Sequence, residues 1–169
     1  MKTFSVQVIQ RVAHYSATIV MLLLASYSIW YCHAALAPFS RMKRVVTLDG
    51  RVRTALFQSE SIQRGFLLTG DPSVISLYAE AKTNLRTQVN LFSEELRTDR
   101  REQDIAREIE TLVRLKVDEM DTTIDTAQRK DLKTALNIFR TNIERDYTAQ
   151  ICNDLNLVRG IETGRTYAR

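Results

Sequence analysis

The stretch Gln63-Arg64-Gly65-Phe66-Leu67-Leu68-Thr69-Gly70-Asp71-Pro72 decides how this 169-residue sequence folds. Apolar residues with helical spacing run into it, and a Gly-Asp-Pro turn follows at once. Glycine suits the position after a helix, aspartate caps the next helix, and proline fits its first turn. One long helix is therefore predicted to end here and another to begin. The structural motif consists of Gly65, Gly70, Asp71 and Pro72.

Polar residues within this stretch are the candidate ligand-binding residues: Gln63, Arg64 and Thr69. A second interpretation stays open, in which Arg64 and Thr69 only satisfy the helix end by hydrogen bonding. Gly65 lies inside the helix, where glycine costs about 1 kcal/mol relative to alanine. We expect close packing against a neighbouring helix to compensate for this cost.

Upstream of the turn, a seam of mostly apolar residues repeats with alternating spacings of four and three, which is typical of a heptad. This seam predicts a helix and is also a candidate surface for a parallel homodimer. The candidate dimer residues are Leu48, Val52, Ala55, Ser59 and Ile62.

Downstream of the turn, helical spacing of apolar residues predicts three more long helices. They cover residues 72–97, a third segment that begins after Asp99, and a continuous fourth segment from Leu132 to about Ile161. Asp99 and Glu102 have the spacing of a capping box. Arg129-Lys130-Asp131 is the third connection. Equal lengths and short connections predict an all-α fold, an antiparallel up-down four-helix bundle.

Residues 12–40 contain no Asp, Glu, Lys or Arg. A helix needs about 20 apolar residues to cross a bilayer, and aromatic residues mark its two interfaces. We therefore predict a transmembrane helix over residues 13–36, in preference to a cleaved signal peptide. The expected organisation is a short cytoplasmic tail (1–12), the membrane helix (13–36), the bundle (41–161) and a polar C-terminal tail (162–169).

The net charge of +4 does not indicate nucleic acid, because the positive excess flanks the uncharged stretch. Residues 54–169 carry 17 basic and 19 acidic side chains. The two histidines, His14 and His33, both lie in or beside the predicted membrane segment. No metal site, cofactor site or catalytic residue is predicted, and the chain is not expected to be an enzyme.

The segment Gln63 to Asp71 closely resembles the signature of the third CHASE family, the extracytoplasmic sensory domains associated with cyclases and histidine kinases. The resemblance covers residues 47–157, and Asn142 stands where that family usually has glycine. It implies a four-helix bundle that follows an N-terminal transmembrane helix. Family members usually continue into an output domain, so the resemblance also implies a sensor that signals through a separate protein, or a truncated chain.

The predicted function is thus a membrane-anchored sensory domain that relays a signal by helix shift. The expected partners are the bacterial inner membrane, a second copy of the chain and a histidine kinase or cyclase-type output protein. The alternative is a ligand-free helical adaptor that docks a partner protein. Counting lysine and arginine alone places the bundle in the cytoplasm, whereas the resemblance places it outside. A cytoplasm-facing scaffold is therefore the third possibility.

Overall fold

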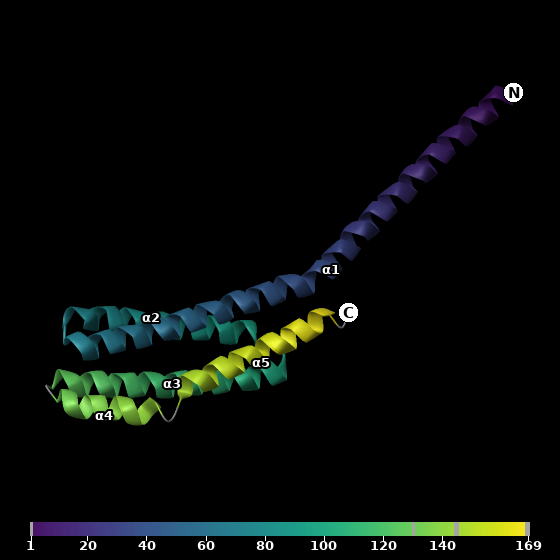
Figure 1. Ribbon diagram of the computed structural model, residues 1–169. Coiled ribbons are helices and arrows are strands. Elements are labelled where there is room, and N and C mark those ends of the chain that lie inside the picture. The colour runs from purple at the N-terminus through teal and green to yellow at the C-terminus, as the bar shows by residue number, and fades with distance from the viewer. Residues whose placement is uncertain (1, 130, 144–145, 168–169) are drawn as a thin grey trace. The chain divides into compact units, whose positions relative to one another are not determined.

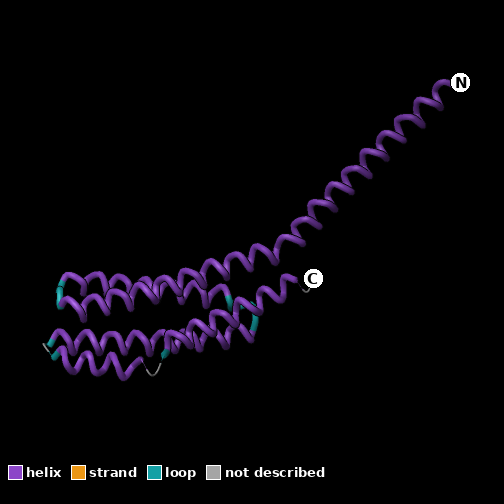
Figure 2. The backbone as a smooth tube through the Cα atoms, in the orientation of Figure 1, coloured by secondary structure: helices purple, strands orange, loops and turns teal. Residues whose placement is uncertain are grey.

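The computed structural model describes the backbone of residues 2–129, 131–143 and 146–167 (Figure 1). Side chains are described within these ranges except at residues 2–14, 17, 33–38, 141–143 and 166–167. The described residues form five α-helices joined by short loops (Figure 2). Their bounds are Lys2–Thr69 (α1), Ser73–Glu95 (α2), Arg100–Gln128 (α3), Leu132–Ile143 (α4) and Tyr147–Tyr167 (α5). The predicted all-α class is confirmed.

The chain divides into two compact units, Met1–Arg41 and Met42–Arg169. The first unit is the N-terminal part of α1, and its described side chains between residues 15 and 40 are exposed. They include a row of large apolar groups from Ile19 to Leu24, together with Trp30. The predicted membrane-facing positions His14 and His33 lie outside the described side chains. In the part of the chain that the structure describes, no helix is long and apolar enough to span a bilayer.

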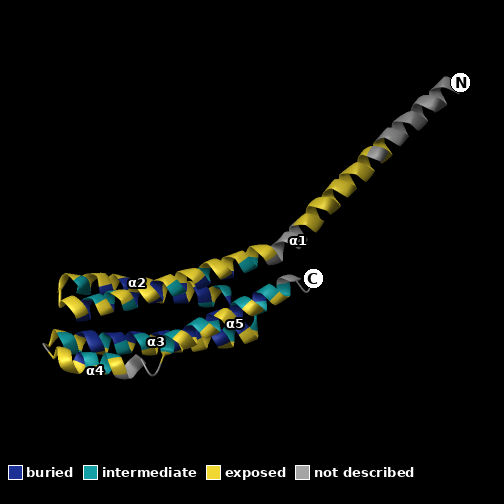
Figure 3. Cartoon of the chain, viewed as in Figure 1, coloured by how far each residue is buried: buried dark blue, intermediate teal, exposed yellow. Residues whose placement is uncertain are grey.

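The second unit is a helical bundle. The remainder of α1, then α2, α3 and the consecutive α4 and α5 form rods that alternate in direction (Figure 1). Helix α3 contacts α2, α4 and α5. Figure 3 shows that buried residues lie along the inner sides of these helices. The largest fully buried apolar side chains are Leu56, Leu85, Phe92, Leu96, Ile109, Met120, Ile151 and Leu155.

The first turn is held by local hydrogen bonds. Gly70 has a φ of 65°, which favours glycine because a Cβ is disfavoured there. Its backbone N donates to Phe66 O at 2.8 Å, closing the last turn of α1. The Asp71 carboxylate accepts from the backbone N of Ser73 at 2.9 Å, which satisfies a free donor at the start of α2. This bond to Ser73 N is also the main reason that the pKa of Asp71 lies below its usual value.

Gly65 does not have the role expected from the sequence. A Cβ placed on Gly65 would meet no described atom of a neighbouring helix within 4 Å. The expectation of close helix packing at this glycine is therefore wrong. The Thr69 hydroxyl donates to the Gly65 carbonyl oxygen at 2.9 Å, but this contact uses the backbone and does not require glycine.

Aspartates also start the later helices. Asp99 caps α3, because its side chain accepts from the backbone N atoms of Arg101 and Glu102 at 2.8 and 3.1 Å. The carboxylate of Glu102 accepts from Arg165 of α5 at 2.6 Å, so it also serves a contact between helices. Asp131 accepts from the backbone N of Thr134 at 2.9 Å and starts α4.

The fourth rod differs from the prediction of one continuous helix. It consists of α4 and α5, with a break between Ile143 and Tyr147. Asp146 supplies the physical reason, because its side chain accepts from Ala149 N at 2.9 Å and caps a new helix. The rod also ends later than expected. Helix α5 runs to Tyr167 through residues predicted as a polar tail, because Glu162 and Arg165 form bonds there.

Candidate functional site

Polar side chains from three helices meet in the core of the bundle. We call this set the polar layer, and it consists of Glu60 and Gln63 of α1, Lys116 and Glu119 of α3, and Thr148 of α5. In α1 and in α3 the two members are three residues apart, so helical geometry places them on one face. The sequence thus interrupts the apolar core at one level of the bundle.

Charged members of the polar layer bind one another. The Lys116 ammonium lies 3.3 Å from a Glu60 oxygen and 3.3 Å from a Glu119 oxygen. The side chains of Lys116, Glu60 and Glu119 are only 12%, 12% and 7% exposed. The Thr148 hydroxyl donates to Glu60 at 2.5 Å. A buried charge is tolerated only when it is paired, so this network is a single unit of α1, α3 and α5.

Gln63 stands apart from this network. The residue is 1% exposed, and neither its side-chain oxygen nor its side-chain nitrogen has a hydrogen-bond partner among the described residues. A buried polar group without a partner costs about 1–3 kcal/mol. Such groups are rare in folded proteins and call for a specific explanation.

Gln63 lines a cavity of about 360 Å³. This volume is within the range of about 300–1,000 Å³ found for small-molecule pockets. Phe139 of α4, Asp146 and Thr148 line the same cavity, so it lies beside both flanks of the α4–α5 break. The full lining is Glu60, Gln63, Arg64, Lys116, Glu119, Phe139, Asp146 and Thr148. We call this cavity the Gln63 pocket.

The structure brings together two of the three candidate ligand-binding residues. Arg64 lines the Gln63 pocket with a side chain that is 56% exposed, and one guanidinium nitrogen lies 3.6 Å from Glu60. Thr69 instead lines a separate, mainly apolar cavity of about 450 Å³ near the first turn. Its hydroxyl also accepts from the backbone N of Asp71 at 3.2 Å. Thr69 therefore belongs to the helix end and not to the Gln63 pocket.

The candidate dimer seam lies against the core of its own bundle. Val52, Ala55 and Ser59 are at most 1% exposed. Leu48 and Ile62 are partly buried and pack against the same core. The heptad spacing of this seam is therefore accounted for by packing within one chain.

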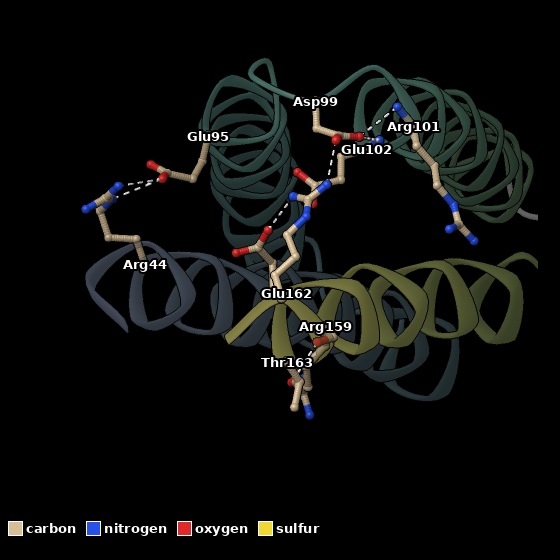
Figure 4. Close-up of polar contacts among 9 residues, drawn as sticks. Arg44, Glu95, Asp99, Arg101, Glu102, Arg159, Glu162 and Thr163 are labelled. Carbon is tan, nitrogen blue, oxygen red and sulfur yellow. Dashed lines mark hydrogen bonds and ion pairs between the residues drawn. The ribbon is translucent and has the colours of Figure 1, made fainter. Parts of the chain in front are cut away.

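A second polar group lies where α3 begins and α5 ends (Figure 4). We call it the end cluster, and it consists of Asp99, Glu102, Glu162 and Arg165. The Arg165 guanidinium donates to Glu102 at 2.6 Å, to Glu162 at 2.9 Å, and also to Asp99. The Glu102 and Glu162 side chains are 0% and 4% exposed. One arginine thus holds the carboxylates of two helices together.

The capping bonds of Asp99 and the charge of Arg165 act in the same direction on its pKa. The backbone N of Glu102 donates to the Asp99 carboxylate, and Arg165 lies beside it, so the pKa of Asp99 is below its usual value. Nearby, Asp49 of α1 binds Arg53 at 2.7 Å and also binds Arg159 of α5. This end of the bundle is therefore closed by ion pairs that join α1, α3 and α5.

Sequence reasoning missed four members of the polar layer: Glu60, Lys116, Glu119 and Thr148. One signal was present, because Lys116 occupies a position in the series of core-facing residues of α3, next to the buried Val117. A charged residue at such a position indicates a buried partner. Which residue is the partner of Lys116 depends on how α1 and α5 are rotated against α3, and the spacing of apolar residues does not determine this rotation.

The fold and its polar cavity fit an all-helical sensor module. Residues 39–169 match the model of the CHASE3 domain, which is more than half of the chain. The chain therefore belongs to the CHASE3 family, whose members are extracytoplasmic sensor domains of the kind found in histidine kinases and cyclases. The family inferred from Gln63 to Asp71 is confirmed.

A solved structure has a similar fold. The sensor domain of histidine kinase HK9 from Rhodopseudomonas palustris superposes with a TM-score of 0.70, at 18% sequence identity. The match covers 75% of this chain and 99% of that structure. At this identity the similarity concerns the fold. The comparison with curated proteins gave no match.

Proposed function

We propose that the chain is a membrane-anchored sensor that binds a small molecule in the Gln63 pocket outside the cytoplasm and signals to a separate protein. The observation that carries this proposal is a glutamine that lines a cavity in a CHASE3 domain and whose side-chain amide is buried and unpartnered among the described residues. A bound molecule would supply the missing hydrogen bonds. This explanation accounts for the presence of an amide at a core position.

The anchor in this proposal is a transmembrane helix over residues 13–36. Its support is the uncharged stretch 12–40 and the exposed apolar side chains from Ile19 to Leu24. Contiguous exposed apolar surface marks a membrane or protein contact. The extracytoplasmic side is inferred from the CHASE3 family rather than from charge. Alkaline phosphatase fused after Arg169 tests it, because the enzyme is active only outside the cytoplasm; an inactive fusion at normal expression rejects the topology.

Signal relay in this proposal uses α1. Glu60 and Gln63 of the pocket belong to α1, and so does the proposed anchor. Binding would favour one packing of α1 against α3 and α5 over another, with shifts of about 1–2 Å. A coupling free energy of about 1–3 kcal/mol is enough to bias an output. A histidine kinase or a cyclase-type protein is the proposed recipient.

The proposal includes a homodimer in which the seam from Leu48 to Ile62 would exchange its packing within the chain for packing against a second copy. Single cysteines at Val52 and Ser59 test this surface in native membranes. Both positions are fully buried in the monomer, so a cross-link would require the seam to leave its own core. Absence of cross-links at both positions, with a dimer still present by size, would move the interface to another face.

The sensing step is tested by thermal unfolding of the full chain in detergent against pools of small polar molecules. A ligand at about 100 times its Kd adds about 2.7 kcal/mol to the free energy of unfolding. A stabilising pool that fails with a Gln63→Leu variant supports the proposal. If every pool leaves the unfolding temperature unchanged while a membrane protein co-purifies with the chain, the adaptor function replaces it.

A further inference from the structure

We propose that the ligand of the Gln63 pocket is a small uncharged molecule that presents a carboxamide-type edge, meaning a hydrogen-bond donor and an acceptor bonded to the same carbon. This inference rests on the proposed sensing function and assigns a chemical class to its ligand. Three features of the pocket support this inference: the donor and acceptor of Gln63 that have no partner among the described residues, the pairing of the pocket's cations, and the apolar wall at Phe139.

The first feature is the amide itself. A glutamine side chain offers a carbonyl acceptor and an NH₂ donor from one planar group. Both atoms of Gln63 are buried and have no partner among the described residues. A ligand that satisfies only one of them leaves the other buried and unpaired, at a continuing cost. The complement that satisfies both is a donor and an acceptor side by side, as in a primary amide, a lactam or a urea.

The second feature is that both cations of the pocket are already paired with carboxylates. Lys116 lies between Glu60 and Glu119, at 3.3 Å from each. Arg64 lies against Glu60 at 3.6 Å. The Asp146 carboxylate accepts from the backbone N of Ala149. An anionic ligand would therefore compete with existing carboxylates for Lys116 and Arg64.

A cationic ligand meets the converse obstacle. To reach the buried carboxylates it would have to displace Lys116 from Glu60 and Glu119, whose side chains are 12% and 7% exposed. The remaining carboxylate, that of Asp146, belongs to an exposed residue, and exposed ion pairs contribute little. Displacing the partner of a buried charge is costly. A neutral ligand leaves all of these pairs intact, so the pairing selects against charge of either sign.

The third feature is the shape of the pocket. The cavity of about 360 Å³ is near the lower end of small-molecule pockets. Phe139 of α4 contributes an aromatic wall, whereas Gln63 of α1 contributes the polar edge. The ligand is therefore expected to join one amide-type group to a small apolar body.

The experiment compares three small benzene derivatives on the full chain in detergent: benzamide, benzoate and benzylamine at neutral pH. The first is neutral with the required edge, the second is an anion and the third a cation. Two readouts are taken, the NMR resonance of the Gln63 side-chain NH₂ and the thermal unfolding temperature. The resonance is assigned by its absence in Gln63→Leu.

Benzamide is expected to move the Gln63 resonance and to raise the unfolding temperature by about 3–6 °C at ten times its Kd. Benzoate and benzylamine are expected to do neither. The variants Gln63→Leu and Gln63→Met should both lose the benzamide response. The matched control is Gln88→Leu, which makes the same change on α2 outside the pocket and should keep the response.

Three outcomes would overturn the assignment of ligand class: an equal or larger effect of benzoate or benzylamine, a benzamide effect that survives in both Gln63 variants, or no effect of any probe. An effect of benzoate or benzylamine that depends on Gln63 would reject the amide class and keep the pocket as the sensing site. The sensing function itself is decided separately by the phosphatase fusion and the screen of pooled molecules.

Discussion

The polar layer and the end cluster both contain buried carboxylates bound by one basic side chain, but only the polar layer contains a polar group without a partner among the described residues. In the end cluster, Arg165 binds Asp99, Glu102 and Glu162, so the buried carboxylates are held by a shared cation. In the polar layer, Lys116 binds Glu60 and Glu119 in a similar way, but Gln63 beside them has no partner among the described residues. The unpaired amide therefore distinguishes the proposed binding site from a structural clamp.

This difference also concerns shape. The Gln63 pocket lies beside the break between α4 and α5, where Asp146 begins a new helix. Two members of the end cluster, Glu162 and Arg165, lie on continuous helix, because α5 runs through them to Tyr167. An interrupted helix leaves space next to polar groups, whereas a continuous one fills it. The comparison predicts opposite responses when similar residues are changed in the two places.

The largest effect is expected from Lys116→Met, which removes the cation of the polar layer and keeps the length of the side chain. Glu60 and Glu119 would then remain buried without the cation that lies between them. Breaking a buried ion pair in this way costs about 3–5 kcal/mol. Urea unfolding of the full chain in detergent, followed by circular dichroism, measures the loss.

Arg107→Met is the matched control for that variant. Arg107 also pairs with a carboxylate on α3, Asp104, but the two side chains are 71% and 61% exposed. Exposed pairs contribute about 0–1 kcal/mol. Equal losses in the free energy of unfolding would mean that solvent screens the polar layer as it screens the surface. The Gln63 pocket would then be filled with bulk water.

A pair of smaller changes tests the comparison directly. Gln63→Leu replaces an unpartnered amide with an apolar group of similar size and should raise the free energy of unfolding by about 1–3 kcal/mol without ligand. Glu102→Leu is the same kind of change in the end cluster, where the carboxylate accepts from Arg165 at 2.6 Å. It should lower the free energy of unfolding by about 1–3 kcal/mol.

The opposite signs are the informative result, and urea midpoints of the two variants in the same detergent provide it. A gain of stability at Gln63 together with a loss of ligand response is the usual trade of stability for function. If Gln63→Leu destabilises the chain as Glu102→Leu does, the amide has a partner in solution and the pocket loses its main support.

The sequence was sufficient for most of the fold because the signals that set it are local. Gly70 and the aspartates at positions 71, 99 and 131 mark helix ends through bonds to residues two to four positions away. The break before Tyr147 was not predicted, because two local signals compete there. The apolar series runs through Ile143, Tyr147 and Ile151, whereas Asp146 caps a new helix.

The sequence predicted only the α1 residues Gln63 and Arg64 of the Gln63 pocket. Gln63 and Arg64 stand in the distinctive stretch before the first turn, so position alone pointed to them. Their partners lie far away in the chain: Lys116 is on α3 and Thr148 on α5. Which face of α3 meets α1 depends on the packing of all helices together. Thr69 was grouped with Gln63 by sequence proximity, although six residues along a helix place it at another level of the bundle.

The smallest expected effect is a loss of stability at low pH, and its size should differ between the end cluster and the other helix caps. Hydrogen bonds from backbone N–H groups lower the pKa of Asp99, as side-chain and backbone bonds from Thr134 lower that of Asp131. A carboxyl whose folded pKa is depressed contributes stability above its unfolded pKa, near the usual value of 3.8. That contribution is lost as the pH falls through the lower folded pKa. Stability should therefore decline below about pH 4.

Asp99→Asn and Asp131→Asn compare the two caps. Both variants lose the ionised cap, but only Asp99 also binds Arg165. The pKa of Asp154 is raised, mainly by burial, so this group acts in the opposite direction and loses its contribution as the pH rises. Because Asp99 also binds Arg165, the urea midpoint should depend less on pH between pH 6 and pH 2 in Asp99→Asn than in Asp131→Asn. Equal pH dependence of the two variants would show that Arg165 adds nothing to the cap, and the end cluster would then be held by Glu102 and Glu162 alone.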